Sequence, residues 1–192
     1  MADLYLSGDP VADQLLSTDP NALLIGMLLD QQVPMEKAFS GPAVIASRMG
    51  GRLDVSAIAA ADTEEFVALC SQPPAIHRFP RAMAERVQAL CVELVEKWDG
   101  QATNLFATAG TGAELRRLLE GLPGFGAAKA QIFLALLGKQ YGITPDGWRE
   151  ASGEYGLDGH RSVADITDHD SLLKVRATKQ AAKAAAKAAK QG

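Results

Sequence analysis

One short segment, Leu-Pro-Gly-Phe-Gly at residues 122–126, constrains the fold of this chain more than any other. Apolar residues recur at helical spacing on both sides of it, over residues 115–119 before it and 132–137 after it. Thr111 and Glu114 have the spacing of a capping box, which predicts the start of the first helix. The pattern therefore predicts a helix, a tight turn and a second helix.

The turn has the chemistry of a backbone anion site. Gly124 and Gly126 permit positive φ and close approach to a ligand, while Pro123 fixes its own φ and has no amide hydrogen. We expect the amides of Gly124, Gly126 and Ala127 to point outward at the start of the second helix, where free N–H groups and the helix dipole favour a phosphate. No side chain takes part, so such a contact has no sequence preference.

At these residues the chain resembles the helix-hairpin-helix (HhH-GPD) glycosylases of base excision repair, which include endonuclease III and the 3-methyladenine glycosylases. The essential aspartate of that superfamily falls on Asp146, in Gly-Ile-Thr-Pro-Asp at residues 142–146. Residues 28–33, Leu-Leu-Asp-Gln-Gln-Val, are similar to its apolar helix ending in a glutamine that fills the gap left by an extruded base. Gln32 matches that glutamine, with Gln31 as the alternative. Residues 78–84 match the basic start of a long helix more weakly.

The resemblance implies an all-α, two-lobed helical fold with a cleft between the lobes, and it implies DNA contacts. Lys129 could equally be a solvated charge, and Gln32 could instead cap the end of its own helix. The residues to which the resemblance assigns DNA contact are Gln32, Arg78, Leu122, Pro123, Gly124, Phe125, Gly126, Ala127 and Lys129.

By the same resemblance Asp146 is the catalytic residue. Its carboxylate would stabilise the positive charge that develops on the sugar as the base departs, and would orient or deprotonate the attacking water. From the residues alone, an aspartate after a proline is also typical of a helix N-cap or a turn. Trp148 is the candidate for stacking in the base pocket, although an aromatic residue at helical spacing is also typical of a core.

The chain departs from the superfamily at the nucleophile. Bifunctional members have a lysine two residues after the second hairpin glycine, and its amine attacks the sugar; here that residue is Ala128. A methyl group cannot attack, so the resemblance indicates a monofunctional enzyme that leaves an abasic site. Lys129 is adjacent, but neighbouring side chains on a helix point about 100° apart. A lyase that uses Lys129 remains an alternative.

No cofactor is expected apart from a tentative monovalent cation. Many members of the superfamily carry a four-cysteine iron–sulfur loop, whereas this chain has only Cys70 and Cys91, so we expect no such cluster. The backbone carbonyls of Glu120, Leu122 and Phe125 resemble the superfamily's cation site at the hairpin.

The chain has 192 residues and 47% hydrophobic composition, enough for one good core. We expect residues 1–173 to form the glycosylase domain, as a monomer. No apolar run reaches membrane-spanning length, and the start of the chain lacks a basic signal-sequence region. These features predict a cytoplasmic protein, associated with the bacterial nucleoid.

Residues 174–192 differ from the rest. They contain six basic residues and no acidic one, in a chain whose overall net charge is −4. Alanine and lysine favour helix, but this segment has no apolar face to bury, so we expect a largely disordered tail that could gain helix on a polyanion. The alternative is a solubilising tail without a partner.

Other local signals predict the helix boundaries. Asp9-Pro10 and Asp19-Pro20 each provide an N-cap followed by proline at the first helical position. Gly41-Pro42 predicts a helix break. The longest helix should run from Pro80 to about Trp98, and a last helix should start near Asp168.

The sequence thus predicts a monofunctional DNA glycosylase that acts on duplex DNA containing a damaged or mispaired base. Residues 31–33, Gln-Gln-Val, are most similar to the 3-methyladenine group, so an alkylated purine is the first substrate to test, and uracil or a mismatch the second. The competing hypothesis is a helix-hairpin-helix module that binds DNA or a lesion without catalysis. Such a module would have no need of Asp146 or of the extrusion glutamine.

Overall fold

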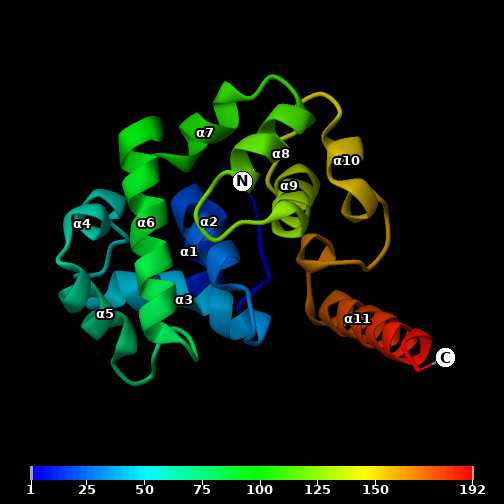
Figure 1. Ribbon diagram of the computed structural model, residues 1–192, viewed down its shortest axis with the longest axis horizontal. Helices are drawn as coiled ribbons and strands as arrows, with labels where there is room; N and C mark the ends of the chain where they lie inside the picture. The colour runs from blue at the N-terminus through cyan, green and yellow to red at the C-terminus, as the bar shows by residue number, and fades with distance from the viewer. Residues whose placement is uncertain (1, 192) are drawn as a thin grey trace.

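The computed structural model describes residues 2–191, which fold as helices joined by short loops (Figure 1). Within that part of the chain no strand is formed; an isolated bridge joins Thr111 to Asp146. No helix there is both long and apolar enough to cross a bilayer. The elements are α1 Pro10–Thr18, α2 Pro20–Leu29, α3 Met35–Arg48, α4 Val55–Ala60, α5 Thr63–Ser71, α6 Pro80–Trp98, α7 Ala102–Thr108, α8 Gly112–Glu120, α9 Ala127–Gln140, α10 Trp148–Ala151 and α11 His169–Ala189, with 3-10 turns η1 Gly153–Gly156 and η2 Val163–Asp165.

Capping side chains start the helices where the sequence predicts. Asp9 and Asp19 accept hydrogen bonds from the first amides of α1 and α2, and proline occupies the first position of both. Thr111 and Glu114 form the predicted capping box of α8. Asp168 caps α11 in the same way. Because each cap satisfies amides that the helix itself leaves free, these boundaries are fixed locally.

The helices form two groups that share one apolar core. In Figure 1, α1–α7 occupy the left and centre and α8–α11 the right. Phe106 of α7 packs on Phe133 of α9 with ring centroids 6.1 Å apart, and the two rings belong to a continuous buried cluster. A hollow of about 330 Å³ lies at the boundary of the two groups, between α7 and residues 142–145.

The predicted break at Gly41-Pro42 is wrong. Helix α3 continues through Pro42 to Arg48. Gly41 is needed here for packing, because a Cβ at this position would lie 2.5 Å from Cδ1 of Leu29. The close contact between α2 and α3 therefore favours a continuous helix despite the hydrogen bond that proline removes.

The basic tail also differs from expectation, since α11 runs as helix through Ala189. Leu172 and Val175 are buried in its first turns, and this burial offsets the cost of nucleation. Once those turns are fixed, alanine and lysine extend the helix at little cost.

We predict that Gly138→Ala destabilises the protein although it lies within α9. A Cβ there would come within 2.3–2.6 Å of ring atoms of Trp148. We expect the free energy of unfolding to fall by about 1–3 kcal/mol, more than cancelling the gain of about 1 kcal/mol in helix propensity. Urea denaturation measures this. Gly121→Ala is the control, because its nearest neighbour would be 3.5 Å away; equal stability of the two variants would contradict the prediction.

Candidate functional site

The hairpin between α8 and α9 is a tight turn held by two buried side chains. The amide of Phe125 donates to the carbonyl oxygen of Leu122 at 3.1 Å, and Gly124 has φ +79°. With Pro123 before that glycine, this is the pattern of a type II turn. Leu122 and Phe125 are 3% and 8% exposed, so their side chains anchor the turn to the core while its backbone faces out.

The start of α9 offers free backbone donors. Gly126 is the N-cap and supplies no side-chain hydrogen bond to the helix. Gly126, Ala127 and Ala128 are exposed, and a Cβ at Gly126 would meet no atom within 4 Å. The first amides of a helix lack internal partners and carry the positive end of its dipole. The start of α9 is therefore open to solvent, and a phosphate site here stays a prediction.

Lys129 does not have either role expected for it. Its Nζ donates to the carbonyl oxygens of Met27, Leu28 and Asp30, at 2.8, 3.1 and 3.2 Å. These contacts use all three ammonium protons to cap the C-terminal end of α2. Burial lowers the pKa of Lys129, opposed by the nearby charge of Asp30. Lys129 is therefore a structural link between the hairpin and α2, with no proton left for DNA.

The two adjacent glutamines have different environments. Gln31 is fully engaged: its Nε2 donates to Leu28 O at 2.8 Å, and its Oε1 accepts from Arg86 at 2.9 Å. Gln32 is exposed, with φ +57°. A positive φ is uncommon for a residue other than glycine and costs free energy that the surroundings must supply. Of the two glutamines, Gln32, the residue expected from the sequence, is thus the one whose exposed side chain could extend toward DNA.

The buried side chain of His77 holds the loop that contains Gln31 and Gln32. Its Nδ1 accepts the amide of Phe79 at 3.1 Å, which leaves the proton on Nε2, and Nε2 lies 2.7 Å from Gln31 O. The ring is 1% exposed, and burial lowers its pKa. Arg78, the predicted DNA contact, follows directly and is exposed, with its guanidinium 4.8 Å from the centre of the Phe79 ring.

Asp146 is exposed on a segment whose backbone is held firmly. Its carbonyl accepts the amide of Gly112, the first residue of α8, at 2.7 Å. A Cβ at Gly112 would lie 2.4 Å from Cα of Trp148, so only glycine permits this approach. The main chain at Asp146 is therefore fixed while its carboxylate faces solvent.

The structure does not place Trp148 in a base pocket. Its ring packs over Gly138 of α9, and the guanidinium of Arg149 covers it at 4.6 Å. This is the core role that its spacing also allowed. The tryptophan fixes α10, and with it the segment that carries Asp146.

A cavity of about 270 Å³ between α9 and α11 is a better candidate for a base pocket. Ile132 lies on its wall, one turn after Ala128 on the same side of α9. The other lining residues are Glu154, Tyr155, Arg161, Ser162, Thr178, Lys179 and Ala182.

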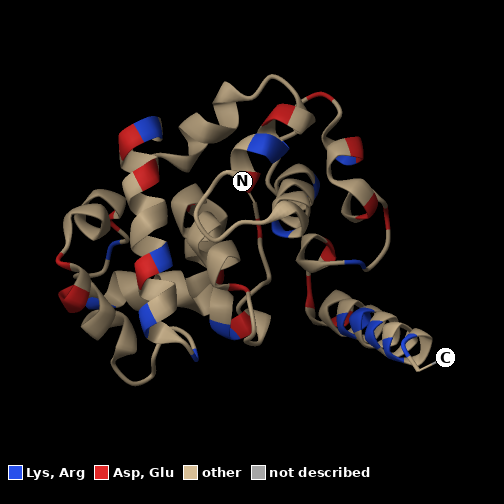
Figure 2. Cartoon of the chain, viewed as in Figure 1, with Lys and Arg blue, Asp and Glu red and all other residues tan. Residues whose placement is uncertain are grey.

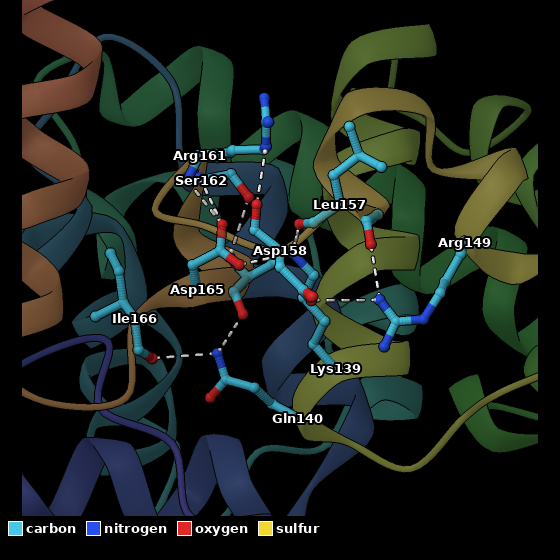
Figure 3. A network of polar contacts seen from close by, with 11 residues as sticks. Lys139, Gln140, Arg149, Leu157, Asp158, Arg161, Ser162, Asp165 and Ile166 are labelled. Atoms are coloured by element: carbon cyan, nitrogen blue, oxygen red, sulfur yellow. Dashed lines mark hydrogen bonds and ion pairs between the residues drawn. The ribbon is translucent and has the colours of Figure 1, made fainter.

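A buried polar network holds the wall of this cavity (Figure 3). Lys139 of α9 donates to the Leu157 carbonyl and to Asp165, both at 2.6 Å. The other oxygen of Asp165 accepts the amides of Arg161 and Ser162, at 2.8 and 3.2 Å. Since Lys139 and Asp165 have side chains only 12% and 7% exposed, their pairing fixes the loop that presents Arg161.

Sequence reasoning identified none of the interactions that Arg86, Lys179 and His77 make with the loop after α2. Arg86 lies on the exposed face of α6, and nothing in the sequence pattern of that helix distinguishes it. Lys179 belongs to a segment expected to be disordered. For His77, its position directly before Arg78 at the start of that helix was the only available signal.

Comparison with known families decides the assignment. The family model described as "HhH-GPD superfamily base excision DNA repair protein" matches residues 25–191. The chain belongs to this superfamily. No curated protein and no solved structure gave a match. As an HhH-GPD protein the chain binds DNA and has a base excision repair function of the glycosylase type. The match includes the second half of α2, the hairpin, Asp146 and all of α11.

We predict that Lys129→Met lowers stability without changing the salt dependence of DNA binding. Carbonyl oxygens at the end of α2 would lose their partner, which should cost about 2 kcal/mol in free energy of unfolding. A phosphate contact, in contrast, would contribute about 0.9 to the slope of log affinity against log salt. Lys97→Met, at an exposed site, is the control for denaturation. A stable variant with a reduced slope would restore the phosphate assignment.

The buried His77 should make stability fall with acid. Because its pKa in the folded state lies below 6.5, the unfolded chain takes up the proton first, so stability decreases as pH drops below about 6.5. His77→Gln should flatten this part of the profile, measured as unfolding free energy between pH 7 and 5. His169→Gln, at an exposed position, should follow the parent protein. Parallel profiles for all three proteins would refute the prediction.

Proposed function

We propose that this protein is a monofunctional DNA glycosylase that removes a damaged or mispaired base from duplex DNA. The observation that carries the proposal is an exposed aspartate, Asp146, on a fixed backbone, together with alanine at the superfamily's nucleophile position, Ala128. One chain contains the hairpin, Gln32 and Asp146, so the reaction needs only a monomer.

The DNA strand would be held by its backbone. A phosphate would bind at the amides of Gly126 and Ala127. Helix α8, which is nine residues long, separates this hairpin from Asp146. At 1.5 Å per residue this is about 13 Å, or the axial rise of about four nucleotides. The sugar that reacts would therefore lie a few nucleotides from the clamped phosphate. Gln32 would fill the space that the extruded base leaves.

The chemistry follows from these positions. Extrusion costs a few kcal/mol, least at a damaged or mispaired base. As the glycosidic bond breaks, its electron pair leaves with the base and positive charge develops on the sugar. The Asp146 carboxylate stabilises that charge and orients the attacking water, which adds at the sugar and transfers a proton to the carboxylate. Since Ala128 has no amine, no Schiff base forms and the product is an abasic site.

The cavity between α9 and α11 is the proposed base pocket. In bifunctional members the lysine at the Ala128 position must reach the sugar, so a cavity one turn further on the same side of α9 is suitably placed for the base. Tyr155 supplies a ring for stacking. Glu154 favours a cationic alkylated purine, which is the first substrate to test; Arg161 and Lys179 favour a base with carbonyl oxygens, such as uracil.

We also propose that a monovalent cation binds the carbonyls of Glu120, Leu122 and Phe125. The Leu122 oxygen accepts one hydrogen bond, from Phe125, and a carbonyl has a second lone pair for a cation. When bound, the cation would add positive charge next to the phosphate. With or without the cation, the phosphate contact that we assign to the protein is made by the amides of Gly126 and Ala127.

The decisive test is a panel of duplexes that contain 3-methyladenine, 7-methylguanine, uracil or a mismatch, incubated with the protein and then treated with alkali to cleave abasic sites. We expect product from at least one duplex, and a decrease of about 100-fold or more for Asp146→Asn. Equal rates for the two proteins would end the catalytic assignment. Tight binding without product from any duplex would indicate the non-catalytic module.

Ala128→Lys provides a matched test of the nucleophile position. Ala128 is exposed, so a lysine fits there. We expect the parent to form no adduct with abasic DNA under borohydride, and Ala128→Lys to form one, because the new amine can attack the sugar. An adduct with the parent protein that Lys129→Met abolishes would instead show a lyase that uses Lys129.

A further inference from the structure

Four basic residues of α11 and its C-cap residue, Lys190, lie on one side of the helix. At 100° per residue they fall within an arc of about 80°. Lys174 lies on the opposite side and pairs with Asp170 at 2.6 Å. We call the five residues the basic stripe: Arg176, Lys179, Lys183, Lys187 and Lys190.

Contacts at its inner end fix the direction of the basic stripe. Leu172, on the same side of the helix, is 5% exposed and packs into the core. Arg176 forms an ion pair with Glu36 at the start of α3. The charge of Lys179 lowers the pKa of Asp30, against the larger effect of burial, which raises it. The stripe therefore begins beside the loop that carries Gln32.

The outer part of the stripe is exposed and unpaired. Within residues 2–191 no carboxylate lies within ion-pair distance of Lys183, Lys187 or Lys190. In Figure 2 the outer turns of α11 are blue and tan, whereas red and blue are interspersed over much of the body. The remaining side chains there are mainly alanine, which gives no apolar face for a membrane or a protein groove.

We propose that the basic stripe is a second DNA-contacting surface, which binds the phosphates of duplex flanking the site at Gln32. From Arg176 to Lys190 the helix rises about 21 Å, which matches about six base pairs. The hairpin would hold the DNA on one side of Gln32 and the stripe on the other. The contact is to the backbone, so it strengthens binding to every sequence and requires no base excision.

The arrangement of these charges fits a duplex-binding surface better than a tail that only keeps the protein in solution. A tail that only solubilised the protein would gain nothing from placing its charges on one side. The stripe has a fixed direction, and it continues from the half-buried acidic residues Asp30 and Glu36, beside the loop that carries Gln32. Regular positive charge on a straight helix suits a rigid polyanion.

The test compares the parent protein with two variants of the full chain, one that loses two charges of the basic stripe and one that moves them to another side of the helix. K183A/K187A removes two charges. K183A/A185K/K187A/A189K keeps the charge and composition and moves both lysines by about 200° around the helix. Binding to an undamaged 24-base-pair duplex is measured by fluorescence anisotropy from 50 to 200 mM salt. Circular dichroism checks that α11 stays helical in each variant.

We expect both variants to bind less tightly than the parent, by about tenfold at 50 mM salt, and their log–log salt slopes to be smaller by about 2. Parental affinity in the moved-lysine variant would overturn the proposal, because only total charge would then matter. Parental affinity in K183A/K187A would overturn it as well. Binding to vesicles of anionic phospholipid is measured in parallel. A variant that loses more affinity for the vesicles than for the duplex would also overturn the proposal. Because the duplex has no lesion, failure here leaves the proposed glycosylase activity untouched.

Discussion

The contact on which the candidate site depends is the one between Lys129 and the end of α2. Three carbonyl oxygens that a helix terminus leaves without partners receive the ammonium of a residue from the start of α9. This single side chain sets the position of the hairpin relative to the loop that carries Gln32. Because a buried carbonyl without a donor is costly, the two segments cannot separate easily. His77 and Arg86 reinforce the same loop through Gln31.

A second constraint, close backbone approach at glycine, holds Asp146. The main chain of Trp148 packs against Gly112 so closely that a Cβ at residue 112 would clash with it. The ring of Trp148 packs against Gly138 in the same way. The tryptophan thus joins α8, α9 and α10 into one unit. The exposed carboxylate can therefore act from a rigid support, which electrostatic catalysis requires. In the proposed mechanism, rigidity at Asp146 and strain at Gln32 are complementary, because Asp146 would stabilise charge and Gln32 would replace the extruded base.

Much of the site was predictable because it depends on local chemistry. The hairpin needs glycine, proline and two apolar anchors in a fixed order, and Gly124 has the expected positive φ. Lys129 shows the limit of this reasoning. A lysine beside a phosphate site predicts a DNA contact, yet this one faces inward, because the unsatisfied end of α2 lies on that side. Trp148 was ambiguous for the same reason, because helical spacing does not reveal whether the ring faces the protein core or a ligand pocket.

The sequence by itself determined the helical class, the caps, the length of α6, the hairpin and the superfamily, all of which depend on residues close together in the chain or in a fixed order. Tertiary structure alone decided which glutamine is free, which lysine caps a helix, where a cavity forms between α9 and α11, and which side of α11 carries unpaired charge. These are properties of surfaces from distant segments. Their energies come from burial and from satisfied polar groups, and no local pattern encodes them.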